Sequence, residues 1–86
     1  MFKNKTAEGR NNICGENLYR LRKNYPTKMS QRILAEQMQL RGIDVDKNAI
    51  QRMECGKRFI TDIEIVALAQ IFDITCDELL TKHISE

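Results

Sequence analysis

Four polar side chains between residues 46 and 54 carry the chain's most specific chemistry. Lys47 and Gln51 are four residues apart and would project from one face of a helix, with Asn48 and Arg52 forming the adjacent stripe. Side-chain amides pair with adenine, and Arg or Lys with guanine, at the base edges exposed in the major groove of DNA. The chemistry available to this stretch is therefore hydrogen bonding to bases.

The same stretch has an apolar side formed by Ala49, Ile50 and Met53 at helical spacing. Asp46 precedes it as an N-cap candidate, because its carboxylate can accept a backbone N–H, and Gly56 marks its end. We therefore expect a short helix that docks on the rest of the molecule by one face and presents the other face to solvent.

Apolar residues recur at helical spacing in four further segments, which predicts an all-α protein of five short helices without strands. Pro26 ends the first segment, because the residue before proline avoids the helical conformation, and Gly42 ends the second. Capping boxes, in which a threonine and a glutamate bond reciprocally to backbone N–H groups, begin the last two at Thr61 and Thr75. The four segments cover about 13–25, 30–41, 61–72 and 75–80.

Length and charge indicate one domain with a polyanionic partner. The chain has 86 residues, which suits a single compact unit. Residues 1–58 hold 13 Lys/Arg and 6 Asp/Glu, a net charge of +7, whereas residues 59–86 hold one Lys and 6 acids, a net charge of −5. A basic half beside an acidic half favours binding to a polyanion. We divide the chain into a flexible polar arm (1–12), a domain (13–82) and a tail (83–86).

Catalysis, metal binding, membrane insertion and secretion are not predicted. His83 is the single histidine and lies in a polar tail, without a partner that would make it a general base. Cys14, Cys55 and Cys76 lack the paired spacing of a zinc site, and their odd number argues against a disulfide scaffold. No segment approaches the ~20 apolar residues of a membrane span, and no apolar core follows the charged N-terminus. We therefore expect a cytoplasmic, non-enzymatic protein without cofactor, metal or small-molecule ligand.

Taken in order, these features resemble the Cro and phage-repressor family of helix-turn-helix DNA-binding domains, also called lambda-repressor-like or Xre-type. The likeness runs from about Ile13 to Leu80. It is carried by Gly15-Glu16-Asn17-Leu18 with Leu21-Arg22, Ser30-Gln31 with Leu34-Ala35, the run from Ala49 to Arg58, Leu68-Ala69, Phe72-Asp73-Ile74 and Asp77-Glu78-Leu79-Leu80. The resemblance implies a sequence-specific transcriptional regulator of the repressor type that binds an operator in double-stranded DNA, usually as a homodimer.

The resemblance also implies base contacts from the helix at about 46–54. Lys47, Asn48 and Gln51 fall where members of the family touch base edges from their recognition helix. Arg52 falls at the flank of that helix, where contact with a base or a phosphate is common. We expect all four side chains to contribute to the reading of the operator.

Phosphate contacts are implied on both sides of that helix. Ser30 and Gln31 fall where the preceding helix touches a phosphate with its N-terminus, and Arg32 adds a positive charge beside them. Lys57 and Arg58 match a loop that follows the DNA backbone. These five residues are expected to position the protein on the duplex rather than to read its sequence.

The family resemblance also implies one salt bridge, and the chain departs from the family pattern in the length of two segments. Arg22 and Glu54 match a salt bridge between the first helix and the end of the recognition helix, so Arg22 is expected to be a strut. The segments 23–29 and 36–45 are longer than in the commonest family pattern, the second by about one helical turn. If the second helix runs to Arg41, the turn after it keeps the usual length of about 3–4 residues.

A protein-binding module, such as an antitoxin-like partner of another protein, is the alternative. Its surface would be the apolar region at 62–80, some of which could instead be covered by the N-terminal arm or by the last helix. The helix at 62–72 is apolar on two sides, with Ile65, Leu68, Ala69 and Phe72 on one and Ile63, Val66 and Ala67 on the other. Dimerisation through this region is compatible with DNA binding.

Overall fold

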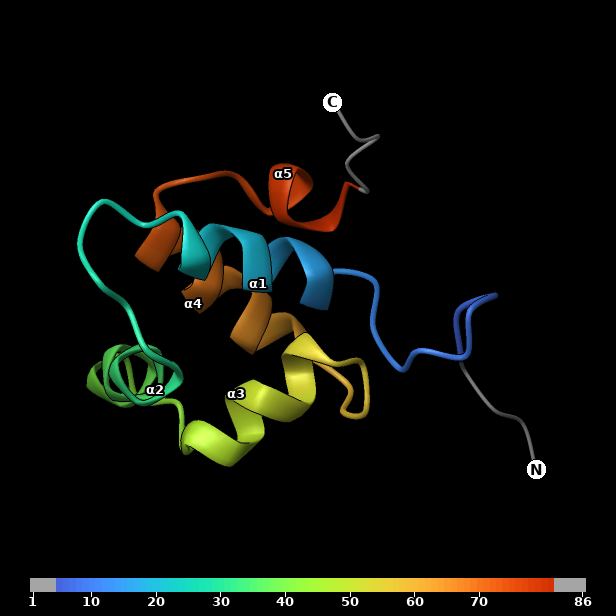
Figure 1. Ribbon diagram of the computed structural model, residues 1–86, viewed down its shortest axis with the longest axis horizontal. Helices are drawn as coiled ribbons and strands as arrows, with labels where there is room; N and C mark the ends of the chain where they lie inside the picture. Colours follow the sequence, from blue (N-terminus) through green and yellow to red (C-terminus); the bar gives the residue numbers. More distant parts are fainter. Residues whose placement is uncertain (1–4, 82–86) are drawn as a thin grey trace.

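Five α-helices make up the regular secondary structure of the computed structural model, which describes residues 5–81. The expected all-α architecture is confirmed for this part of the chain, and each helix begins within two residues of its expected start. The expected tail (83–86), with His83, lies outside the described residues. The helices are α1 (Gly15–Lys23), α2 (Gln31–Leu40), α3 (Lys47–Glu54), α4 (Asp62–Phe72) and α5 (Cys76–Leu80) (Figure 1).

Capping residues fix where four of the helices begin, as the sequence predicted. Ser30, Asp46, Thr61 and Thr75 each accept, through a side-chain oxygen, the backbone N–H three residues further on, at 2.9–3.3 Å. At Thr61 and Thr75 the glutamate three residues on accepts the threonine N–H in return, which completes both capping boxes. These bonds satisfy backbone donors that have no partner within the helix.

A packed turn of the predicted length connects α2 and α3. α2 ends at Leu40 and is followed by Gly42 with φ 82°, so residues 41–46 separate the two helices. Val45, within this connection, is 4% exposed and belongs to the apolar core. Gln39 Nε2 donates to Val45 O at 2.8 Å. Counted between the C-cap Arg41 and the N-cap Asp46, the turn is residues 42–45, which agrees with the predicted length of about 3–4 residues.

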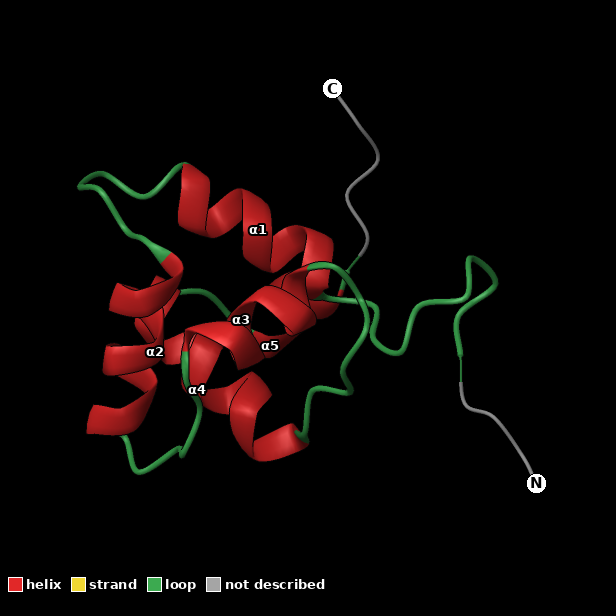
Figure 2. Ribbon diagram, turned by 60° about the horizontal axis from the view of Figure 1, so that its bottom comes forward, coloured by secondary structure: helices red, strands yellow, loops and turns green. Residues whose placement is uncertain are grey.

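All five helices contribute to one apolar core. Figure 1 shows α2 and α3 as neighbours, with α1 crossing between them and α5, and Figure 2 shows the same neighbours from a second direction. α2 and α3 make the most extensive contact of any pair of helices. No helix within residues 5–81 is long and apolar enough to cross a membrane. Seven large core side chains are completely buried: Leu18, Leu34, Met38, Ile50, Met53, Leu68 and Leu79.

Residues 10–12 differ from the expectation of a loosely packed arm. Asn12 is 8% exposed, and Arg10, Asn11 and Asn12 all donate hydrogen bonds to backbone carbonyls between residues 53 and 58. These partners are more than 40 residues away along the chain, so no local spacing could predict them. The packed domain therefore begins before residue 13.

Candidate nucleic-acid interface

α3 has one buried face and one exposed polar face, as its sequence predicted. Its apolar side chains dock into the core, where Ile50 and Met53 are wholly buried. The four side chains predicted to contact bases are all exposed: Lys47, Asn48, Gln51 and Arg52. Within the part of the chain that the structure describes, none of these four side chains takes part in a hydrogen bond or ion pair. Their donors and acceptors are therefore available to a ligand.

The position of α3 in the molecule leaves this face accessible. α3 lies along one edge of the fold in Figure 1 and comes to the front in Figure 2, where no other helix lies in front of it. The Oδ1 atom of Asp46 caps its first turn through Ala49 N–H at 2.9 Å. Both ends of α3 are therefore held in place, because Met53 and Glu54 in its last turn accept hydrogen bonds from Asn12 and Arg22.

Two of the three polar residues predicted to bind phosphate at the start of α2 have partners within the protein. The Ser30 hydroxyl accepts the N–H of Ile33 at 3.1 Å, and Gln31 Nε2 donates to Glu54 Oε1 at 3.0 Å. Arg32 is exposed, and its side chain has no hydrogen bond or ion pair among the described residues. Arg32 is therefore the strongest phosphate candidate of the three.

Lys57 and Arg58, predicted to share one role, have different surroundings. The Lys57 side chain is exposed and without an ion pair among residues 5–81. The Arg58 Nη1 and Nη2 atoms donate to the two carboxylate oxygens of Glu64 at 2.9 and 3.0 Å, and Nη1 also donates to Phe59 O at 2.9 Å. Arg58 is therefore a weaker phosphate candidate than Lys57, because its guanidinium ties the loop after α3 to the start of α4.

The electrostatics of Arg58 and Glu64 agree with this ranking. Burial alone would raise the pKa of Glu64, but the hydrogen bond from Arg58 and the backbone hydrogen bond from Thr61 outweigh it, and the pKa is lowered. The hydrogen bond to Glu64 raises the pKa of Arg58 in turn. Glu64 thus serves both the capping box of α4 and the ion pair, and much of the Arg58 charge is neutralised within the protein.

Arg22 and Glu54 form the ion pair that the family resemblance implied. Arg22 Nε lies 2.6 Å from Glu54 Oε2, and Nη2 donates to Oε1 at 3.0 Å. Arg22 Nη1 also donates to Met29 O at 3.1 Å, and both side chains of the pair are buried. Because Gln31 donates to the same carboxylate, this network joins α1, the last residue of α3 and the first residue of α2.

Two further basic residues near α2 were missed by the sequence reasoning. Lys23 and Lys28 are exposed and, with Ser30, line a hollow of about 420 Å³ beside the start of α2. Both flank the segment 24–27, within the region that is longer than the common family pattern. The extra length of this region was the signal that could have pointed to the two lysines, because inserted loops often carry additional contacts.

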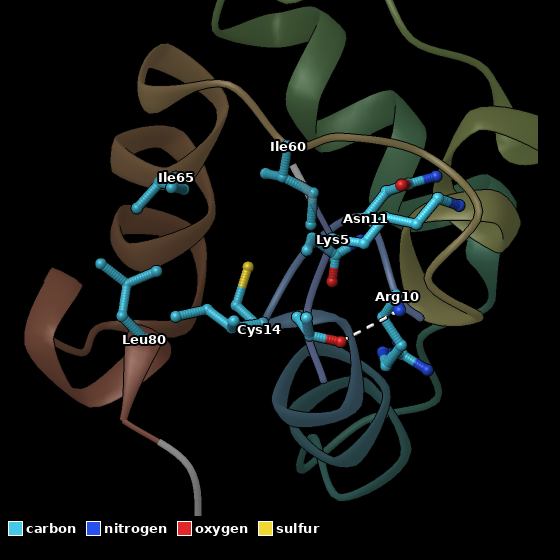
Figure 3. A pocket seen from close by; sticks show the side chains of 10 residues that line it. Lys5, Arg10, Asn11, Cys14, Ile60, Ile65 and Leu80 are labelled. Atoms are coloured by element: carbon cyan, nitrogen blue, oxygen red, sulfur yellow. Dashed lines mark hydrogen bonds between the residues drawn. The ribbon is translucent and has the colours of Figure 1, made fainter. Parts of the chain in front are cut away.

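A hollow of about 550 Å³ lies between the N-terminal segment and α4–α5 (Figure 3). Ile60, Ile65 and Leu80 line one side of it, and Arg10 lies on the other side. Cys14 lies between the two sides and is 1% exposed; burial raises the pKa of its thiol. A buried thiol with a raised pKa is a weak nucleophile at neutral pH. This hollow therefore has one apolar and one polar side, and Cys14 gives it no reactive chemistry.

Arg32 and Lys57 lie on segments next to α3, because α2 packs against α3 and the loop that carries Lys57 follows it. Arg58 and Gln31 each have a hydrogen-bond partner inside the protein. Comparison with known proteins adds no assignment, since no protein-family model, curated protein or solved structure matches the chain.

Proposed function

We propose that this protein is a sequence-specific DNA-binding transcriptional regulator of the repressor type. In this proposal α2 and α3 form the helix-turn-helix, and α3 is the recognition helix. The observation that carries it is the exposed face of α3, where Lys47, Gln51 and Arg52 present base-binding chemistry with no protein partner among the described residues. A helix with its side chains is about 10–12 Å wide and fits a major groove of about 12 Å.

Exposed charges near the C-terminal end of α3 support the same orientation. Arg32 lies in the first turn of α2, whose first residue, Gln31, bonds to the last residue of α3, and Lys57 lies in the loop after α3; both are exposed. Contacts with phosphates there would set the register of the helix, while base contacts would supply the specificity. Lys23 and Lys28 extend the positive charge beyond the start of α2.

A homodimer is part of the proposal, because helix-turn-helix proteins bind half-sites about 34–36 Å apart through two-fold dimers. The candidate interface includes Phe59, Ile63 and Val66, which are 56%, 67% and 48% exposed. Leu80 lies further along the apolar region at 62–80. The free cysteines Cys14, Cys55 and Cys76 are consistent with a reducing cytoplasm.

The same apolar residues favour a second candidate, a module that binds another protein. An exposed apolar patch on a small domain is a common mark of a protein interface. This candidate leaves the exposed polar face of α3 without a role, which is why DNA binding is the first proposal.

Selection of bound duplexes from a random pool tests the proposed function. We expect the protein to enrich one sequence, arranged as an inverted repeat with half-sites about 34–36 Å apart. The matched control is the triple variant Lys47→Ala, Gln51→Ala and Arg52→Ala, which changes only exposed side chains and should fold normally while enriching no sequence. If the parent protein enriches nothing even at low salt, the proposal fails and the protein-binding module becomes the better candidate.

A further inference from the structure

Residues 10–12, which we call the N-terminal clip, are hydrogen-bonded to the C-terminal end of α3. Arg10 Nη2 donates to Glu54 O at 2.8 Å, and Asn12 Nδ2 donates to Met53 O at 3.0 Å. Met53 O also accepts the N–H of Gly56 at 3.2 Å, whereas Glu54 O has no backbone donor among the described residues, so the bond from Arg10 satisfies a carbonyl that would otherwise need water. The clip thus acts as a side-chain cap supplied from a distant part of the sequence.

The clip also holds the loop that follows α3. Three consecutive carbonyls of this loop accept hydrogen bonds from it, and the exposed Lys57 side chain lies at the middle position. The backbone is therefore fixed on both sides of that lysine. The bonds join Asn11 N to Gly56 O at 2.8 Å, Asn11 Nδ2 to Lys57 O at 3.1 Å and Asn12 Nδ2 to Arg58 O at 2.7 Å.

Close packing at this junction leaves little freedom. Gly56 has φ 82°, which other residues adopt only with strain, and a Cβ atom there would lie 2.7 Å from Arg10 Cζ. Asn12 is 8% exposed, and its Oδ1 atom accepts the N–H of Gly15 at 2.8 Å. Asn12 therefore joins the start of α1 to the end of α3 and, being buried, cannot itself touch a duplex.

From these contacts we infer that the N-terminal clip is a positioning element of the DNA-binding surface, an inference that rests on the proposed function. The clip sets the direction of the last turn of α3 and the place of Lys57. A lysine on a fixed loop loses less conformational entropy when it meets a phosphate than one on a loose loop. Asn12 therefore contributes to DNA affinity through Lys57 and without contacting DNA.

A double-mutant cycle between Asn12→Asp and Lys57→Ala tests the inference. Aspartate keeps the shape of asparagine and the oxygen that accepts the Gly15 N–H, but it cannot donate to the carbonyls of α3 and the loop. Affinity is measured on the selected duplex, at a temperature where circular dichroism shows every variant to be folded. In the parent, Lys57→Ala should make the salt slope of binding shallower by about one unit.

In the Asn12→Asp background, Lys57→Ala should change the affinity and the salt slope much less than it does in the parent. The effect of Lys57→Ala on affinity should differ by at least about threefold between the two backgrounds. The matched control is Arg32→Ala on α2, for which no contact with the clip exists among the described residues; its effect should add to that of Asn12→Asp. If Asn12→Asp does not fold, Asn11→Ala removes the bond to Lys57 O and takes its place in the cycle.

Additive effects of the clip and Lys57 variants would overturn the inference, because a residue that only stabilises the fold does not couple to Lys57 in folded protein. A parent protein that binds no duplex would overturn the proposed function, and with it the inference. The two failures are distinguishable, because the first requires normal DNA binding by the parent and the second excludes it.

Discussion

Replacing Arg22 by alanine is expected to lower the free energy of unfolding by about 3–5 kcal/mol, out of roughly 5–15 for a whole domain. The Glu54 side chain is 5% exposed and would keep only Gln31 as a side-chain partner. A buried carboxylate without its cation is strongly destabilising, because it has lost both its hydration and its counter-charge. Thermal or urea melts followed by circular dichroism measure this loss.

Glu54→Ala should also be strongly destabilising, since it leaves the buried Arg22 guanidinium with Met29 O as its remaining hydrogen-bond partner among the described residues. The double variant Arg22→Met and Glu54→Leu should lose less than the sum of the single variants, because no charge remains buried. Arg32→Ala is the surface control, because that exposed side chain has no hydrogen bond or ion pair among the described residues, and it should change stability by less than about 0.5 kcal/mol. If Arg22→Ala and Glu54→Ala both unfold at the same midpoint as the parent, the ion pair does not stabilise the fold.

DNA affinity is expected to fall steeply as salt concentration rises. Four of the exposed basic side chains lie on α3 or on the segments next to it and have no ion pair in the described chain, and each phosphate contact contributes about −0.9 to the slope of log K against log salt. The slope should therefore be about −3 to −4 per protomer, or a loss of roughly a hundredfold between 50 and 200 mM salt. The four are Arg32, Lys47, Arg52 and Lys57.

Fluorescence anisotropy on a labelled duplex across a salt series measures this slope. Arg58→Ala is an informative control, because its guanidinium is already bound to Glu64 and its removal should leave the slope unchanged. Lys57→Ala should make the slope shallower by about one unit. A flat response at all salt concentrations would remove DNA from the list of partners.

Local interactions explain which parts of this structure follow from sequence. Ser30, Asp46, Thr61 and Thr75 bond to groups three residues away, so the helix starts could be read from short patterns. The exposed face of α3 followed from residue spacing for the same reason, since neighbours on a helix are three or four residues apart.

Long-range contacts explain what sequence reasoning missed. Asn12 bonds to carbonyls 41 and 46 residues away, and an asparagine in a polar stretch gives no sign of such partners. Arg58 and Glu64 are only six residues apart, but the sequence pattern predicted only the capping-box role of Glu64 and not its ion pair. The Arg22–Glu54 pair spans 32 residues and was expected from the family resemblance alone.

The central claim is that the exposed face of α3 reads DNA sequence, and the affinity of Gln51→Ala for two duplexes tests it most directly. The variant should lose about 1–3 kcal/mol of binding free energy on the selected duplex and much less on random DNA, because the Gln51 amide matches an adenine edge. Lys57→Ala is the control and should weaken binding to both duplexes about equally. If Gln51→Ala lowers both affinities equally while Lys57→Ala changes the preference between duplexes, α3 does not read the bases and the claim is contradicted.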